Sequence, residues 1–175
     1  AALAGTTLGG RAFAQAAPKK GGTLRISAPA NPSSLDPATG GAGSDHAFLF
    51  TMYDTLVEWE FETLKPKPGL AESWKFTDPN TLVLNIRSGV TFHDGKSLTS
   101  ADVVFSGQYC MDPEGGCSQL AKFEGIESIE AVDDLTVRIN FTNPMPDPYS
   151  AFVGSQSPIL QKAQFEACKG VNAPT

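Results

Sequence analysis

An alternation of apolar and polar positions between residues 81 and 87 predicts a β-strand. Leu82, Leu84 and Ile86 fall on one side of an extended chain, and two of the three intervening positions are polar. The strand should end near Gly89, because glycine adopts backbone angles that a side chain penalises. We therefore expect a short strand with one buried face.

A sharp turn and a helix should follow this strand. Asp94-Gly95 is one of the strongest turn dipeptides, because both residues tolerate positive φ. Thr99 stands three residues before Asp102, which is a variant of the capping box, and apolar residues follow it. This pattern predicts a helix over residues 100–109.

Weaker patterns predict the remaining elements. We expect strands at 23–27 and 56–59, a helix that starts at Ser44 or Asp45 and reaches residue 54, an extended segment at 70–76, a hairpin of 125–132 and 135–141, and a short helix at 149–153. Residues 65–69 contain two prolines, which exclude a helix interior or a central strand, so we expect an exposed connection there. Residues 28–43 hold three prolines and three glycines without any period, which predicts a loop.

Composition and charge limit the class of protein. The chain has 175 residues, of which 41% are hydrophobic, enough for one core or parts of two. Its formal charge of −6 and the absence of a Lys/Arg cluster argue against a nucleic-acid partner. The sequence contains no run of eighteen apolar residues, so we expect no membrane-spanning helix.

Residues 1–16 have a different character from the rest of the chain. They are small, mildly apolar and almost uncharged, and they end in Ala14-Gln15-Ala16, the A-x-A shape that precedes signal-peptidase cleavage. We interpret them as the remnant of a secretory signal peptide, with a disordered N-terminus as the alternative. Either interpretation places them outside the fold.

Two of the three cysteines bracket a short, turn-rich loop. Cys110 and Cys117 are separated by Met-Asp-Pro-Glu-Gly-Gly, a loop that can bring the two sulfur atoms within bonding distance. A disulfide between them fits an oxidising compartment. Cys168 then has no partner within this sequence, and a partner beyond residue 175 remains an open alternative.

The sequence offers little catalytic or metal-binding chemistry. With only His46 and His93 in the chain, no set of histidines, cysteines and carboxylates has the spacing of a closed metal site. No serine lies in a G-x-S-x-G elbow, and no phosphate-binding loop of the Walker type occurs. We expect no catalytic residue, no metal and no cofactor, and we assign His93 to a turn.

Several residues match a known family in both order and spacing. The segment that begins at Leu70, LAESW, followed by VTFHDGKSLTSADVVFS, resembles the extracellular solute-binding proteins, family 5, of ABC importers. The shared positions are Leu70, Ala71, Trp74, Phe92, His93, Asp94, Gly95, Leu98, Thr99, Asp102 and Val103. Proteins of this family are several times longer, so we expect an N-terminal fragment.

The resemblance implies a fold and a division into parts. The fold is an α/β (α+β) arrangement, a periplasmic binding protein of type II with an extra lobe and a mixed and antiparallel sheet. Residues 17–45 would begin ligand-binding lobe I, residues 46–168 would form the extra lobe, and residues 169–175 would return toward lobe I.

The resemblance also implies a function. The family encloses a small solute, most often a peptide, by hinge closure in the periplasm and delivers it to a membrane permease, without catalysis. We expect a monomer, and keep a non-catalytic cell-surface interaction module as the alternative. Leu35-Asp36-Pro37 resembles a family motif at the border of the ligand cleft, which makes Asp36, Thr39, Gly40, Gly41 and Ser44 candidate ligand contacts; a plain loop with an Asx turn at Asp36 is the alternative.

Tyr109 is a further candidate for contact with the ligand. A tyrosine joins apolar area with a hydroxyl that can hold a peptide-like group. Packing in the core is the alternative role of this side chain, as it is for most aromatic residues of the chain.

Overall fold

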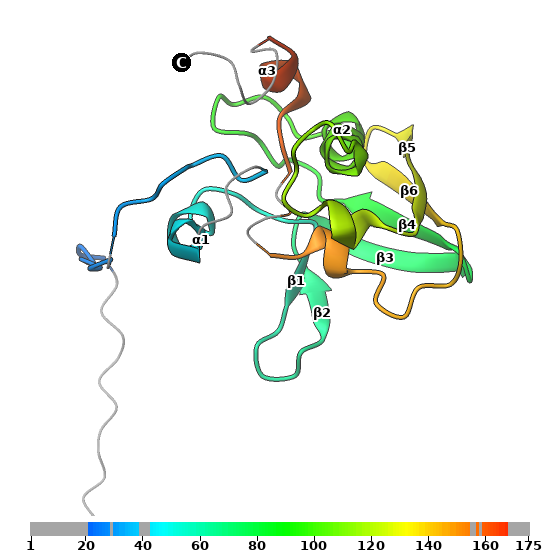
Figure 1. The fold of residues 1–175 in the computed structure, drawn as a ribbon, viewed down its shortest axis with the longest axis horizontal. Coiled ribbons are helices and arrows are strands. Elements are labelled where there is room, and N and C mark those ends of the chain that lie inside the picture. Colours follow the sequence, from blue (N-terminus) through cyan, green and yellow to red (C-terminus); the bar gives the residue numbers. More distant parts are fainter. Residues whose placement is uncertain (1–20, 29, 39–42, 155–156, 158, 168–175) are drawn as a thin grey trace, which may run out of the picture.

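The computed structural model describes residues 21–28, 30–38, 43–154, 157 and 159–167. Along the chain the elements are α1 (Gly43–Leu49), β1 (Val57–Trp59), β2 (Pro66–Pro68), β3 (Ala71–Asp78), β4 (Thr81–Ile86), α2 (Ser100–Met111), the 3₁₀ helix η1 (Leu120–Phe123), β5 (Ile126–Asp133), β6 (Thr136–Phe141), the 3₁₀ helix η2 (Ser150–Phe152) and α3 (Lys162–Ala167). The predicted α/β class with antiparallel strands is confirmed (Figure 1).

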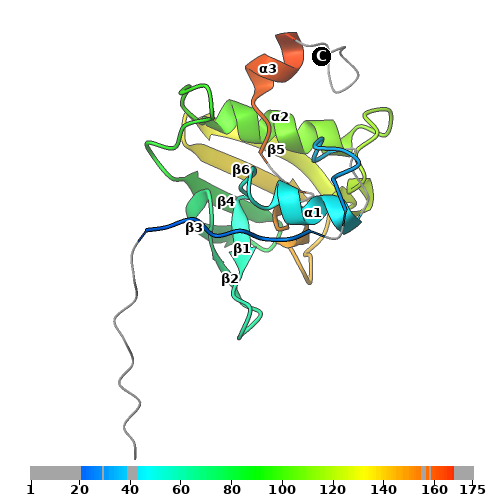
Figure 2. The ribbon, with the colours of Figure 1, turned by 90° about the vertical axis from the view of Figure 1, so that its left-hand side faces the viewer.

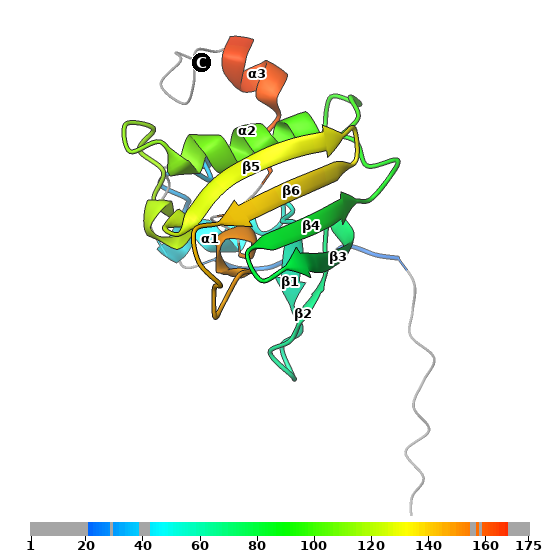
Figure 3. The same cartoon turned by 90° about the vertical axis from the view of Figure 1, so that its right-hand side faces the viewer.

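A four-stranded antiparallel sheet in the order β3-β4-β6-β5 forms the centre of the structure (Figure 3). Leu82 pairs with Ile139 and Leu84 with Val137 across β4 and β6, and all four side chains are buried. The strand predicted at 81–87 and the hairpin predicted at 125–141 are therefore confirmed as β4 and as β5–β6. Alternation along each strand directs these side chains to one face, which carries the core.

The opposite face of the sheet is polar and joined by side-chain hydrogen bonds. Asn85 donates to the Ser73 hydroxyl at 3.0 Å, and Asn140 donates to the Ser128 hydroxyl at 2.8 Å. Arg138 on the same face lies 3.7 Å from Glu130. This division into an apolar and a polar face is what the alternating sequence predicts for a sheet covered on one side.

Helix α2 packs on the apolar face of the sheet, alongside β5 (Figures 1 and 3). The predicted start at residue 100 is confirmed: Asp102 accepts hydrogen bonds from the Thr99 backbone N–H at 3.0 Å and from the Thr99 hydroxyl at 2.9 Å. Gly107 faces Ile129 so closely that a Cβ atom there would overlap the isoleucine side chain. The glycine thus allows the helix to approach the sheet.

The segment at 65–69 departs from the prediction. Pro66, Lys67 and Pro68 form strand β2, which pairs with β1, whereas an exposed connection was expected. The prolines are tolerated because both strands of a two-stranded sheet are edges, where a missing N–H costs no ladder bond. The exclusion of a central strand was correct, and the strand predicted at 56–59 is confirmed as β1.

Two predictions near the N-terminus also need correction. Residues 23–27 are not a strand, and Leu24 and Ile26 are 83% and 82% exposed. A strand needs a neighbour for its backbone hydrogen bonds, and no described strand pairs with this segment, which Figure 2 draws in dark blue as a plain tube. Helix α1 begins at Gly43 and ends at Leu49, so Asp45 lies inside the helix instead of capping it.

Candidate functional site

The first loop is held against α1 by a buried carboxylate. Asp45 is fully buried and accepts two hydrogen bonds of 2.7 Å, from the backbone N–H and from the hydroxyl of Ser33. The Ser33 hydroxyl, followed by its backbone N–H, lowers the pKa of Asp45 below its usual range. Asp45 on α1 therefore fixes the position of Ser33 in the first loop.

The loop then makes a tight turn at Leu35-Asp36-Pro37. Asp36 accepts a hydrogen bond from the Ala38 N–H at 2.9 Å, and the Asp36 N–H donates to the Ser34 hydroxyl at 3.0 Å. Pro37 and Ala38 are buried, whereas Asp36 is half-buried. The Asx turn predicted as an alternative is thus present, and it joins the carboxylate of Asp36 to the backbone of Ala38 in the same loop.

The charge of Asp36 helps to raise the pKa of two tyrosines. Tyr53, whose hydroxyl lies 3.5 Å from the Leu35 carbonyl, has its pKa raised first by burial and then by the Asp36 carboxylate. Tyr109 on α2 also has its pKa raised, by burial, by Asp36 and by Asp112. We call Asp36, together with the two tyrosines whose pKa its charge helps to raise, the Asp36 cluster.

The hydroxyl of Tyr109 is buried and accepts or donates no hydrogen bond within the described part of the chain. Its ring packs against Phe105 and Phe165, with centroids 6.3 and 6.0 Å away. A buried polar group without a partner costs about 1–3 kcal/mol. A polar group placed beside this hydroxyl would therefore be stabilised.

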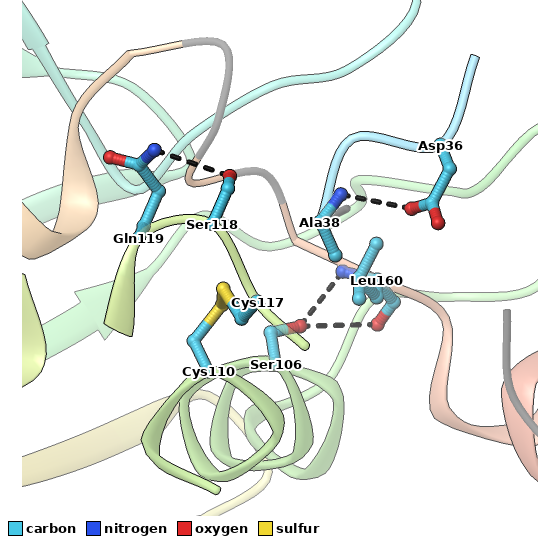
Figure 4. Close-up of a disulfide and its surroundings, with 8 residues drawn as sticks. All are labelled: Asp36, Ala38, Ser106, Cys110, Cys117, Ser118, Gln119 and Leu160. Atoms are coloured by element: carbon cyan, nitrogen blue, oxygen red, sulfur yellow. Dashed lines mark hydrogen bonds between the residues drawn. A yellow bond between two sulfur atoms is a disulfide. The ribbon is translucent and has the colours of Figure 1, made fainter. Parts of the chain in front are cut away.

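A disulfide lies beneath the first loop. Cys110, near the end of α2, is bonded to Cys117, with 5.0 Å between the Cα atoms. The residue after Cys117 reaches the loop, since the Ser118 N–H donates to the Ala38 carbonyl at 2.9 Å. Figure 4 shows the disulfide, Ser118 and the turn of Asp36 and Ala38 in one small region.

The segment that leads into α3 is fixed to α2 and to the turn at Asp94. The Leu160 N–H donates to the Ser106 hydroxyl at 2.8 Å (Figure 4), and the Lys162 N–H donates to Asp102 at 3.0 Å. Between them, the Gln161 amide donates to both carboxylate oxygens of Asp94 at 3.2 and 3.0 Å. Residues 160–162 are thus bound to α2 and to the predicted turn.

That turn holds a strongly acidic carboxylate. Hydrogen bonds from Gln161 and from Lys96 lower the pKa of Asp94 to about 2. Gly95 has φ of +84°, as the Asp-Gly prediction requires, and the neighbouring His93 ring nitrogen lies 3.1 Å from the Met52 carbonyl. The turn therefore links three distant segments of the chain.

An open groove with a volume of about 830 Å³ lies beside the cluster. It is lined mainly by residues of three segments, 50–54, 90–94 and 159–165. Its lining includes Tyr53, Phe92 and Phe165, but neither Asp36 nor Tyr109. The mixture of aromatic rings with a few polar groups is typical of a site for a small ligand.

The structure places the predicted contacts as follows. Asp36 lies near enough to Tyr109 for its charge to help raise the pKa of the tyrosine, whereas Ser44 is exposed at the start of α1, with its hydroxyl 3.4 Å from Asp45. Thr39, Gly40 and Gly41 lie outside the described residues. Sequence reasoning missed Tyr53, Ser118 and Gln161, because their roles depend on contacts with distant segments and no local pattern marks them.

Two further observations concern the described residues alone. Among them, no three His, Cys, Asp or Glu side chains are grouped so that they could hold a metal ion. None of the helices described here has the length and apolar character needed to cross a bilayer.

Comparison with known proteins identifies the class. Residues 65–174 match the family "Bacterial extracellular solute-binding proteins, family 5 Middle". The match covers more than half of the chain, so the chain belongs to the family 5 extracellular solute-binding proteins.

Individual relatives agree with this assignment. The chain is 29% identical to the dipeptide-binding protein of Escherichia coli K12, over 87% of this chain and 32% of that protein. It is 34% identical to heme-binding protein A of Haemophilus influenzae, over 65% of this chain and 24% of that protein. The chain thus spans less than a third of the length of either relative.

A solved structure agrees as well. The PBP AgaA from A. tumefaciens R10, in complex with agropinic acid, superposes with a TM-score of 0.75 at 27% identity, over 83% of this chain and 29% of that chain. These three relatives are named for, or solved in complex with, three different solutes: a dipeptide, heme and agropinic acid.

Proposed function

We propose that this chain is part of the substrate-binding component of an ABC importer, which captures a peptide or a similar small solute and delivers it to a membrane permease. Family membership supports the solute-binding role, and the E. coli dipeptide-binding relative supports a peptide. The protein acts in the periplasm after a signal peptide directs it there, as a monomer, and performs no catalysis.

The Asp36 cluster is the observation that carries the peptide proposal. Asp36 offers a negative charge that helps to raise the pKa of both tyrosines, the Tyr53 hydroxyl lies at the Leu35 carbonyl next to Asp36, and the Tyr109 ring packs among aromatic side chains. The α-ammonium group of a peptide would pair with Asp36, and a peptide carbonyl or amide would bond the Tyr109 hydroxyl. Such charge-assisted bonds fix the orientation of the bound peptide.

The remaining predicted contacts complete the proposal. Thr39, Gly40 and Gly41 follow the turn directly in the sequence, and Ser44 is the second residue of α1, so backbone N–H groups and hydroxyls of this loop would bond the peptide. Residues 17–45 would belong to lobe I and residues 46–168 to the extra lobe, and residues 169–175 would return to lobe I. Hinge closure between lobes would then enclose the solute.

Titration calorimetry with trialanine, N-acetyl-trialanine, an opine and heme tests this proposal. We expect trialanine to bind and its acetylated form to bind at least about tenfold more weakly, because acetylation removes the ammonium charge. Asp36→Asn should weaken trialanine binding by about tenfold to a hundredfold while keeping the Asx turn.

Asp78→Asn is the matched control. Asp78 makes the same kind of turn, accepting from the Asn80 N–H at 2.9 Å, but it is exposed between β3 and β4. Its replacement should leave trialanine binding unchanged. Equal affinity for free and acetylated trialanine, or preference for heme over every peptide, would refute the proposed solute.

A further inference from the structure

The amino-acid composition of the loop between Cys110 and Cys117 does not by itself favour one conformation. The loop contains Gly115 and Gly116, and hydrogen bonds within it form short turns at Asp112, such as the bond from the Gly115 N–H to the Asp112 carbonyl at 3.0 Å. Adjacent glycines lose more conformational freedom on ordering than other residues do. The disulfide that closes this loop therefore restricts the positions that the loop can adopt.

The loop touches the Asp36 cluster on two sides. A Cβ atom at Gly115 would lie 2.8 Å from the Tyr109 carbonyl, so the loop folds back directly on the last turns of α2. At its other end, Ser118 donates to the Ala38 carbonyl, and Ala38 in turn donates to the Asp36 carboxylate (Figure 4). Both cysteines are buried, with exposed fractions of 6% and 7%.

We propose that the Cys110–Cys117 disulfide is a brace that positions the Asp36 turn against Tyr109, and thereby sets the affinity for the solute. The two cysteines are positioning residues, since they act through Ser118 and Ala38 and do not contact the solute. The effect on affinity depends on the proposed peptide-binding function, whereas the effect on the position of the turn does not.

The alternative is a bridge that stabilises the whole fold without any special effect on the turn. The two roles differ in where the structure loosens when the bridge is removed. A brace affects the Ser118 amide and residues 33–38, and leaves the β4–β6 pairing intact. A general stabiliser affects all of these amides together.

The test compares Cys168→Ser protein, which keeps the bridge, with the triple variant Cys110→Ser/Cys117→Ser/Cys168→Ser. Amide hydrogen exchange is measured at Ser118, in residues 33–38, and at Leu84 and Val137 in the core. We expect exchange at Ser118 to accelerate roughly fivefold or more, the factor expected for one backbone hydrogen bond, with the core amides unchanged.

Affinity for trialanine should fall by a similar factor in the triple variant. The dithiol dithiothreitol, which gives two electrons and two protons to the disulfide and becomes a cyclic disulfide itself, should reproduce both effects in the Cys168→Ser protein and have none in the triple variant. This second route avoids any substitution at the bridge.

Each outcome is decisive. Unchanged exchange at Ser118, or equal acceleration at Ser118 and in the core, would overturn the brace. Faster exchange at Ser118 with unchanged trialanine affinity would overturn the effect on binding. If the bridged protein binds no peptide but Ser118 exchange still accelerates alone, the brace holds and the proposed function fails.

Discussion

The hydroxyl of Ser106 should be a main attachment of the segment that leads into α3. It lies on α2, is buried, accepts the Leu160 N–H at 2.8 Å and donates to the Asp102 carbonyl at 2.7 Å. Leu160 is itself 3% exposed, so its N–H has little access to water once the hydroxyl is removed. Ser106→Ala therefore leaves a buried donor unsatisfied.

The magnitude follows from two opposing effects. A buried N–H without a partner costs about 1–3 kcal/mol. Alanine is a better helix former than serine by roughly 0.5 kcal/mol, and the Asp102 carbonyl is at a position that the helix ladder already satisfies. We therefore expect Ser106→Ala to lower the free energy of unfolding by about 1–2 kcal/mol.

Urea unfolding followed by circular dichroism measures this change as a lower midpoint with an unchanged slope. Exchange of the Leu160 amide should accelerate together with it. Ser73→Ala is the control, because Ser73 is exposed and its hydroxyl accepts a hydrogen bond from Asn85 on the polar face of the sheet; this substitution should change stability by less than about 0.5 kcal/mol. Equal unfolding midpoints for Ser106→Ala and Ser73→Ala would refute the reasoning.

Three other predictions concern the core, a close backbone contact and pH. Leu84→Ala removes a fully buried side chain at the centre of the sheet and should cost about 3–5 kcal/mol in urea unfolding, so a loss below about 1 kcal/mol would contradict the assigned core. Gly69→Ala should cost at least about 2 kcal/mol, because its Cβ would lie 2.5 Å from the Thr55 carbonyl oxygen, whereas Gly43→Ala meets no atom within 4 Å and should be neutral; equal thermal midpoints would contradict this contact. Asp94 has a folded-state pKa of about 2 against 3.8 ordinarily, so its stabilisation is complete above pH of about 4 and is lost as the pH falls toward 2; the stability difference between the wild type and Asp94→Asn should shrink over that range, and a difference independent of pH would contradict the hydrogen bonds from Gln161 to the Asp94 carboxylate.

Elements with a strong local pattern were predictable from the sequence. Strand β4 has a strict alternation at Leu82, Leu84 and Ile86, and α2 has its starting signal in Thr99 and Asp102. Each signal lies within a few residues of the element that it specifies. Each element could therefore be predicted without knowledge of its contacts with the rest of the chain.

Elements that depend on a partner were harder to predict. Residues 23–27 alternate as a strand does, yet the structure gives them no neighbouring strand. Pro66 and Pro68 discourage strand structure locally, but pairing with β1 overrides this preference. In both cases tertiary pairing, and not the local pattern, decides the outcome.

The candidate site was predictable only in part, for the same reason. Asp36 and Tyr109 could be singled out by a motif and by residue type, but nothing local places Tyr53 or Ser118 beside them. Asp102 illustrates the limit well. Its capping role was visible three residues from Thr99, whereas its bond to the Lys162 N–H joins positions far apart in the sequence.

Helix α2 therefore joins the core of the fold to the candidate site. Its apolar side packs on the sheet, while Asp102 and Ser106 hold residues 160–162, and the loop after Cys110 holds Ala38. Because side chains of a packed helix accept the N–H groups of Leu160 and Lys162, residues 160–162 must move together with the sheet. The hinge closure proposed above would consequently bend outside these three residues, since a pivot within them would break the bonds of Leu160 and Lys162 at the moment of closure.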